Sequence, residues 1–224
     1  MSRRNVISAI VGLLAAWGGT ALLVSPVALS LGRSSPVAVS FFGQVALWLL
    51  CAGVIGIVLF WERKPLASLW IRPFQYQSFV WAGVLIFAHV ILIFPLTEWV
   101  RKSIGLPGYA AGVKMALTLP LWVRIPAVLT AGVVEEILFR GYPVTRLASL
   151  TGSAALAVFF SSAVFAALHF PIWGAGASLA FFIGGLATTS FFVWRRDLLT
   201  MIVAHIAIDT WGLVLTPAFS RWWM

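Results

Sequence analysis

The chain has 224 residues, of which 62% are hydrophobic and only 9% are charged, and its formal net charge is +9 at pH 7. Soluble globular domains carry about 25% charged residues, so this composition excludes a soluble domain and indicates an α-helical membrane protein. The basic residues fall mostly between apolar runs, where topology signals and contacts with anionic lipid belong, so no nucleic-acid partner is expected. Because Cys51 is the only cysteine, neither an internal disulfide nor a cysteine-based zinc site is expected.

Three apolar runs in the N-terminal part predict membrane spans at residues 6–31, 37–61 and 74–97. Arg3 and Arg4 precede the first run, as they would in a signal peptide. That run is longer than the apolar region of a signal, about 7–15 residues, which favours a retained anchor helix. Residues 105–115, which include Leu106-Pro107-Gly108, are expected to form an interfacial linker.

Four further runs predict spans at residues 117–147, 154–169, 177–194 and 198–215, separated by breaks at 149–152, 174–176 and 195–197. The expected fold class is an all-α, polytopic transmembrane helix bundle with seven spans, or eight if the segment around 100–117 enters the membrane. No long polar linker divides the chain, so a single integral-membrane domain, 1–224, is expected. Trp222 and Trp223 are expected to anchor the end of the chain at the interface.

The distribution of basic residues predicts the orientation of the bundle. More Lys and Arg residues lie on the side of the N-terminus than on the other side, which favours a cytoplasmic N-terminus. We therefore expect a multi-pass integral protein of a bacterial cell membrane.

The fourth predicted span carries three charged residues close together, Glu135, Glu136 and Arg140. A charge at the bilayer centre costs about 2.5–3.5 kcal/mol even on the lenient insertion scale, so these residues need a reason to be there. Glu136 and Arg140 are four residues apart and share a helix face, so they are expected to pair. Glu135 points about 100° away and stays free for chemistry. The alternative is a helix leaving the membrane, with Arg140 at the interface.

Two later spans carry polar side chains at helical spacing. Phe165 precedes His169 by one turn and is expected to wall its imidazole, and His205 and Asp209 share a face, so that the carboxylate can orient the imidazole. Helix rise places Glu135 and His169 at similar depth and His205 at a shallower depth. This mismatch predicts broken or tilted helices. The alternatives are an interfacial His169 and a self-satisfied His205–Asp209 pair.

The remaining polar residues receive structural interpretations. Glu62 and Glu98 flank spans and are expected to be interface charges, whereas Asp197 lies in a turn and Arg124 is expected to snorkel to the interface. His89 has no acidic neighbour in the sequence and is expected to be a packing residue.

A carboxylate, two imidazoles and a further carboxyl group in an apolar bundle suit the activation of water. A glutamate held out of water is a competent general base, and a histidine can assist it or donate a hydrogen bond to an oxyanion. The reaction that these groups imply is hydrolysis of a peptide bond in or beside the membrane.

The three motifs, Glu135-Glu136-x-x-x-Arg140, Phe165-x-x-x-His169 and His205-x-x-x-Asp209, resemble in order and spacing those of the CPBP family of intramembrane endopeptidases. That family includes the CAAX prenyl endopeptidases, the Ras-and-a-factor converting enzyme and bacteriocin self-immunity proteins. The resemblance covers about residues 117–215, the expected catalytic core. It implies that Glu135 activates water with help from His169, that His205 and Asp209 form the oxyanion side, and that Glu136, Arg140 and Phe165 support them.

Other readings of these residues stay open. The family has been described both as metalloproteases and as glutamic proteases, and the absence of a His-Glu-x-x-His motif favours the second, with no cofactor. A zinc-dependent enzyme would use Glu135, His169 and His205 as ligands. A non-enzymatic immunity or transport protein is the remaining alternative. The expected partner is a protein or peptide substrate in the lipid bilayer, with or without a lipid anchor.

Overall fold

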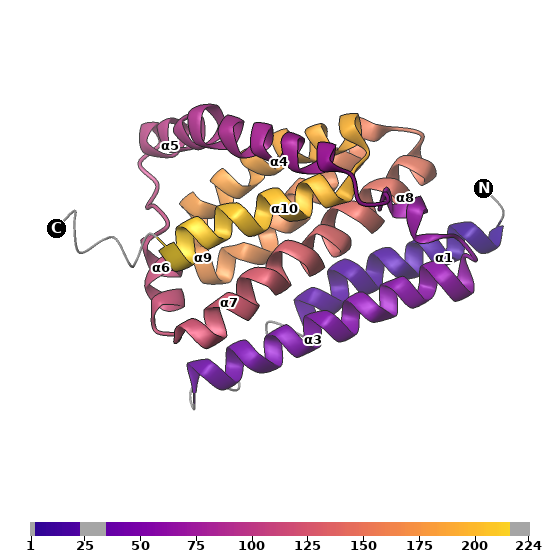
Figure 1. Cartoon of the computed structure of the whole chain (residues 1–224), viewed down its shortest axis with the longest axis horizontal. Helices are drawn as coiled ribbons and strands as arrows, with labels where there is room; N and C mark the ends of the chain where they lie inside the picture. The colour runs from indigo at the N-terminus through magenta and orange to yellow at the C-terminus, as the bar shows by residue number, and fades with distance from the viewer. Residues whose placement is uncertain (1–2, 23–34, 216–224) are drawn as a thin grey trace.

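The computed structural model describes residues 3–22 and 35–215, and within these ranges all regular structure is helical, which confirms the all-α class (Figure 1). The predicted anchors Trp222 and Trp223, and the end of the first predicted span, lie outside the described residues. Segments labelled η are π-helical, except for the 3-10 helix η3. The elements are α1 (Arg3–Leu13), η1 (Leu14–Gly19), α3 (Pro36–Gly56), η2 (Ile57–Trp61), η3 (Leu66–Leu69), α4 (Tyr76–Ala88), η4 (His89–Ile93), α5 (Phe94–Ser103), α6 (Ala110–Leu117), α7 (Leu121–Thr130), η5 (Ala131–Gly141), α8 (Tyr142–Thr151), α9 (Ala154–Arg195), α10 (Leu198–Asp209) and η6 (Thr210–Leu215).

Five helices in the described ranges are long and apolar enough to cross a membrane, so the chain is an integral membrane protein, but the expected count of seven spans is not confirmed. They are Arg3–Leu22, Pro36–Trp61, Tyr76–Ser103, Ala154–Arg195 and Leu198–Leu215. The fourth predicted span corresponds to α7, η5 and α8, which together carry five charged side chains (Arg124, Glu135, Glu136, Arg140 and Arg146). The fifth and sixth predicted spans are the two limbs of α9.

Helix α9 bends at the glycine-rich break that the sequence predicts. Gly174 has φ 77° and ψ 177°, a conformation that side chains rarely adopt. A straight helix of 42 residues would be about 63 Å long, twice the thickness of the bilayer core, so the bend lets two shorter limbs pack inside the bundle. At Gly176 a Cβ atom would overlap the carbonyl oxygen of Pro107, which shows how closely the α5–α6 connection rests against the bend.

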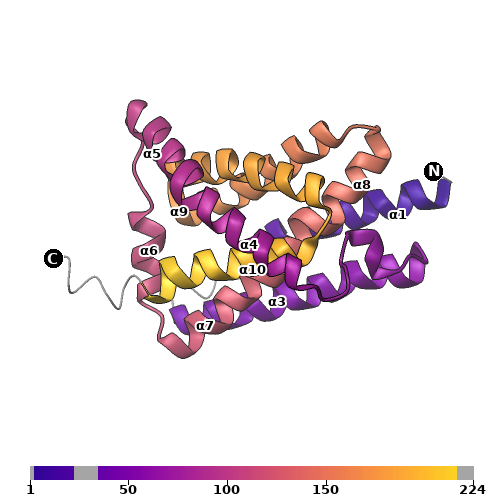
Figure 2. The same ribbon diagram turned by 45° about the horizontal axis from the view of Figure 1, so that its top comes forward.

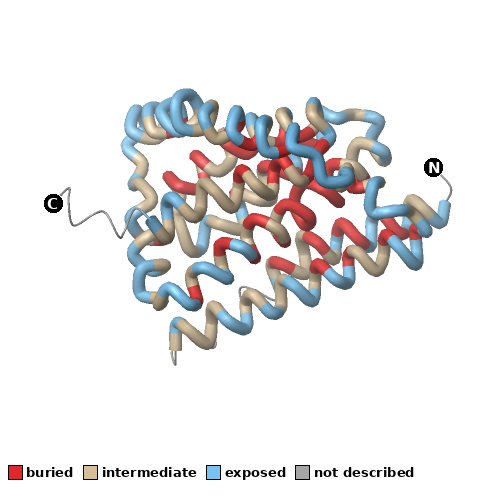
Figure 3. Tube along the Cα trace, in the orientation of Figure 1, coloured by how far each residue is buried: buried red, intermediate tan, exposed pale blue. Residues whose placement is uncertain are grey.

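Helix α10 lies at the centre of the bundle, between α4 and η5 (Figures 1 and 2). Burial is highest where α10 meets η5, α8 and α9, and the outer faces of α3, α4 and α5 are exposed (Figure 3). Lipid gives no hydrophobic drive for helices to associate, so close approach depends on small residues. Gly132 of η5 provides such a contact, because a Cβ atom there would overlap the side chain of Ile206 in α10.

Two acidic residues are more deeply placed than the sequence suggested. Glu62 follows the end of a span, where the sequence indicated an interface charge, but it is buried: it is 7% exposed and pairs with Arg146 of α8 at 2.6 Å, and the Tyr142 hydroxyl donates to it at 3.0 Å. Asp197 does lie in a turn, but it is buried. It accepts hydrogen bonds from the Leu199 amide and from the hydroxyls of Ser78 and Thr200, and so caps α10 and ties it to α4.

Candidate active site

The π-helical segment η5 presents its two carboxylates to different surroundings. The side chain of Glu136 is 1% exposed, whereas that of Glu135 is 17% exposed. Segments of π-helix are rare and frequently mark functional sites. The two neighbouring glutamates therefore divide into one that is enclosed by partners and one that faces open space.

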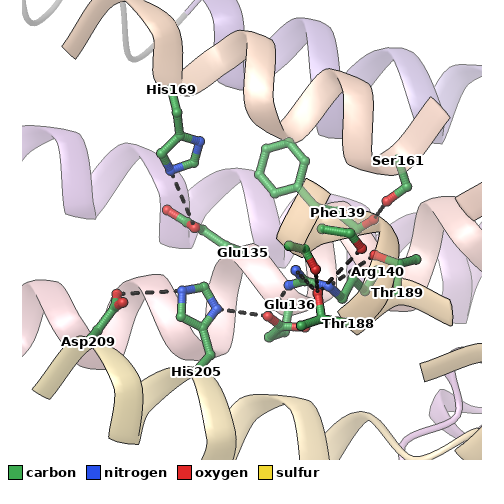
Figure 4. Close-up of polar contacts among 12 residues, drawn as sticks. Glu135, Glu136, Phe139, Arg140, Ser161, His169, Thr188, Thr189, His205 and Asp209 are labelled. Carbon is green, nitrogen blue, oxygen red and sulfur yellow. Dashed lines mark hydrogen bonds and ion pairs between the residues drawn. The ribbon is translucent and has the colours of Figure 1, made fainter. Parts of the chain in front are cut away.

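Glu136 and Arg140 pair, as their spacing predicted, and the guanidinium has further partners on α9 (Figure 4). Its Nε donates to the Thr189 hydroxyl at 3.3 Å and its Nη2 to the Thr188 hydroxyl at 3.2 Å. The same Glu136 Oε1 that accepts from Arg140 lies 2.8 Å from Nδ1 of His205. The buried Glu136–Arg140 pair thus joins η5 to α10 through the carboxylate and to α9 through the guanidinium.

Glu135 faces His169 on the first limb of α9, with 4.0 Å between Oε2 and Nε2 (Figure 4). The other ring nitrogen, Nδ1, lies 2.7 Å from the Phe165 carbonyl. A carbonyl only accepts, so Nδ1 carries a proton, and in the neutral imidazole Nε2 is then the acceptor. A separation of 4.0 Å is too long for a direct hydrogen bond and suits a pair of groups that share a water.

His205 lies between two carboxylates. Its Nδ1 is held by Glu136, and its Nε2 is 3.5 Å from Asp209 Oδ2, one turn along α10. The Asp209 contact is the looser of the two, and the Asp209 side chain is the more exposed, at 27%. The edge of the ring that faces Asp209 is therefore the edge that can reach a ligand.

Aromatic rings enclose His169. Phe165 lies 4.3 Å from it between ring centroids and Phe181, on the second limb of α9, lies 5.1 Å away. Phe165 also packs edge-on against Phe139 and lies 5.4 Å from the Arg140 guanidinium carbon. These contacts hold the imidazole at the side of Glu135 and keep its surroundings apolar.

One cavity of about 960 Å³, whose walls are mostly apolar, is lined by the four candidate catalytic residues Glu135, His169, His205 and Asp209. The volume is that of a site for a sizeable ligand. His89 also lines it, and its Nδ1 is buried without a hydrogen-bond partner among the described residues. Tyr109 closes one end of the cavity against Phe94 at 6.1 Å, and burial raises the pKa of its hydroxyl.

The placement of His205 bears on the zinc alternative. No group of three or more His, Cys, Asp or Glu side chains among the described residues is arranged to hold a metal ion. The two ring nitrogens of His205 face carboxylates, Nδ1 toward Glu136 and Nε2 toward Asp209. Glu135, His169 and His205 are therefore not grouped as zinc ligands in this structure.

The structure brings together the side chains that the sequence singled out, and it adds three contacts that the sequence reading missed. These are the Glu136–His205 contact and the bonds from Arg140 to Thr188 and Thr189. The available signal for the two Arg140 bonds was the pair of adjacent threonines, Thr188 and Thr189, in an apolar span. Broken helices, which the depth mismatch of His205 predicted, are present: α9 is interrupted at Gly174 and η5 is π-helical.

The comparisons with known proteins found one related family. Residues 117–211 match the family model of "Type II CAAX prenyl endopeptidase Rce1-like" proteins, about two fifths of the chain. No curated protein and no solved structure matches the chain. The matched residues contain all three motifs, whereas five polar residues of the cavity lie outside the match, namely Ser40, Gln44, His89, Thr97 and Tyr109.

Proposed function

We propose that the protein is a metal-independent endopeptidase that hydrolyses a peptide bond with water activated by Glu135 and His169. The match of residues 117–211 to a CAAX-type intramembrane protease family supports this proposal. The observation that carries the proposal is the Glu135–His169 pair across 4.0 Å, on the wall of a large apolar cavity. A water between them donates one hydrogen to the Glu135 carboxylate and one to Nε2 of His169. Its lone pairs then point away from both groups and toward a bound carbonyl carbon.

The proposed reaction has two steps. Glu135 takes a proton from the water while the oxygen bonds to the carbonyl carbon, and the π electrons of the carbonyl move onto its oxygen. When this oxyanion collapses, the carbon–nitrogen bond breaks, and Glu135 returns its proton to the leaving amine. One water is consumed and one carboxyl group and one amine are formed, so no other reactant is required.

His205 is the proposed donor to the oxyanion. Glu136 holds its Nδ1 at 2.8 Å, and two carboxylates beside the ring favour its protonated form, which carries a hydrogen on Nε2. The loose 3.5 Å contact with Asp209 lets Nε2 turn to a developing negative charge. An ionised Asp209 cannot itself donate to that charge, so its proposed role is to orient His205. Stabilisation of this kind contributes about 2.7–4 kcal/mol in other hydrolases.

The proposed substrate is a membrane protein or peptide that ends in Cys-a-a-X, with a prenyl group on the cysteine, as the family description indicates. We also propose that the chain crosses the bilayer seven times. This count takes the two limbs of α9 as separate spans and adds the charged helix of α7, η5 and α8.

The test is cleavage of a quenched fluorescent peptide ending in farnesylated Cys-a-a-X by the purified protein in lipid. We expect Glu135→Gln to abolish cleavage while the unfolding midpoint stays the same. Glu98→Gln is the matched control, because Arg101 keeps its bond to the Leu106 carbonyl, and it should retain most of the activity. Cleavage by Glu135→Gln at the wild-type rate would disprove the assignment.

Two further arms separate the finer claims. The same peptide without the farnesyl group tests whether the lipid is recognised. A chelator tests the zinc alternative, since the proposal requires the rate to be unchanged. Loss of activity that only zinc restores would replace the glutamic mechanism with a metal-dependent one.

A further inference from the structure

A ladder of hydrogen bonds crosses from the lipid face of the bundle into the cavity, away from the catalytic groups. The Trp48 indole Nε1 donates to the Thr130 hydroxyl at 3.1 Å, and the Thr130 hydroxyl donates to Oε1 of Gln44 at 3.3 Å. Nε2 of Gln44 donates to the Ser40 hydroxyl at 3.1 Å. Ser40, Gln44 and Thr130 line the cavity, whereas Trp48 is 46% exposed on the outside.

The ladder has a fixed direction. An indole can only donate, so Thr130 must accept from it and pass its own hydrogen to Gln44. This fixes the amide of Gln44, with the oxygen toward Thr130 and the nitrogen toward Ser40. The second hydrogen of Nε2 and the hydroxyl hydrogen of Ser40 remain as donors at the cavity end. A ligand that meets this end must therefore supply acceptors.

The chemistry of the cavity narrows the choice of acceptor. The free donors of the ladder belong to an amide and a hydroxyl, so they are neutral, and Arg140 on the cavity wall is engaged with Glu136, Thr188 and Thr189. Neutral donors match a neutral carbonyl better than a carboxylate. A peptide in a mostly apolar cavity also needs such partners, because a buried backbone carbonyl without one loses the hydrogen bonds that it makes in water.

The position of Thr130 gives the distance between this hydrogen-bond ladder and the catalytic Glu135. Thr130 lies one π-helical turn before Glu135 on the same helix, and both residues line the cavity. That separation is roughly 7 Å along the axis, which an extended peptide covers in about two residues.

We propose that Gln44 and Ser40 bind a backbone carbonyl of the substrate about two residues from the scissile bond, and so set which bond reaches Glu135. This inference rests on the proposed function for the identity of the ligand as a peptide. It assigns to α3 a part in substrate selection, although α3 lies outside the residues that match the family.

The experiment is a double-mutant cycle that combines substitution of Gln44 with modification of single peptide bonds in the substrate. Each peptide bond of the farnesylated Cys-a-a-X peptide is replaced in turn by a thioamide, whose sulfur is a weaker acceptor than oxygen. In the wild type, one position should raise KM by about three- to tenfold, the range expected for one neutral hydrogen bond, with kcat little changed. In Gln44→Met, which keeps the length of the side chain and removes the donor, the same thioamide should have no further effect.

Trp48→Phe is the matched control. It breaks the same ladder at the lipid face and leaves both cavity donors, so the thioamide effect should persist. Ser40→Ala, a smaller change, should reduce the effect and covers the case in which Gln44→Met fails to fold. If the ladder only joins α3 to α7, all these variants lower the unfolding midpoint and the thioamide effects stay equal across them, which overturns the proposal.

The cycle is also measured as the Kd of each peptide for Glu135→Gln, so the result does not depend on cleavage. Coupling at one carbonyl without any cleavage by the wild type would support the binding role and reject the proposed function. Cleavage without coupling would reject the binding role alone. Failure of Glu135→Gln to bind the peptide would also overturn the inference.

Discussion

Glu135 and Glu136 are adjacent in the chain but differ in the contacts that their carboxylates make. Glu136 has partners on two elements, Arg140 of its own helix and His205 of α10, whereas Glu135 has one long contact with His169. The first arrangement fixes a position, and the second leaves a carboxylate able to take and return a proton. Stability and activity should therefore respond differently to the two residues.

We predict that Glu136→Gln lowers the unfolding midpoint by several degrees, whereas Glu135→Gln does not. Loss of one partner from a buried charge pair costs about 3–5 kcal/mol, and Arg140, with a side chain only 8% exposed, would lose its carboxylate. Thermal unfolding in one detergent, with cleavage measured in parallel, checks this. Equal midpoints for the two variants would contradict the division of tasks.

At the scale of helices, the site depends on how closely η5 and α10 approach. Glu136 and His205 lie 69 positions apart in the chain, and their 2.8 Å contact requires the two helices to touch at Gly132. A Cβ atom there would also lie 3.1 Å from the backbone nitrogen of Ile206, next to His205. The glycine is therefore a condition for the geometry of the site.

We predict that Gly132→Ala reduces kcat on the order of ten- to a hundredfold, because small displacements of catalytic groups have effects of this size. Overpacking should also destabilise the fold by about 1–3 kcal/mol. Gly83→Ala in α4 is the matched control, since a Cβ atom there meets nothing within 4 Å. Similar activities for the two variants would show that the crossing does not position His205.

The elements that the sequence predicted best were those set by local pattern. The break at Gly174, the pairing of Glu136 with Arg140 and the shared face of His205 and Asp209 all follow from spacing within one helix. The residues whose burial the sequence did not predict have partners that are distant in the chain. Glu62 resembled an interface charge because it ends a span, and only the fold brings it to Arg146, 84 positions away.

At the scale of the whole molecule, three hydrogen bonds connect segments at one end of the bundle. Arg4 donates to the Trp61 carbonyl at 2.7 Å, Arg146 to the Ser68 carbonyl at 3.2 Å, and the Leu198 amide to the Trp70 carbonyl at 3.0 Å. The N-terminus, residues 61–70 and the start of α10 therefore lie on one side of the membrane. That side carries most of the basic residues in the connections, namely Arg3, Arg4, Arg63, Lys64, Arg72, Arg195 and Arg196.

The positive-inside rule predicts that this end lies in the cytoplasm. The opposite end holds the α5–α6 connection, where Arg101 is already paired with Glu98 at 2.7 Å. In a background in which the buried Cys51 is replaced by alanine, we predict that Ala67→Cys resists a membrane-impermeant maleimide in intact cells and reacts after lysis. Ala110→Cys should react in intact cells. Both positions are exposed alanines, so their contrast reports orientation alone, and the reverse pattern would place the N-terminus outside.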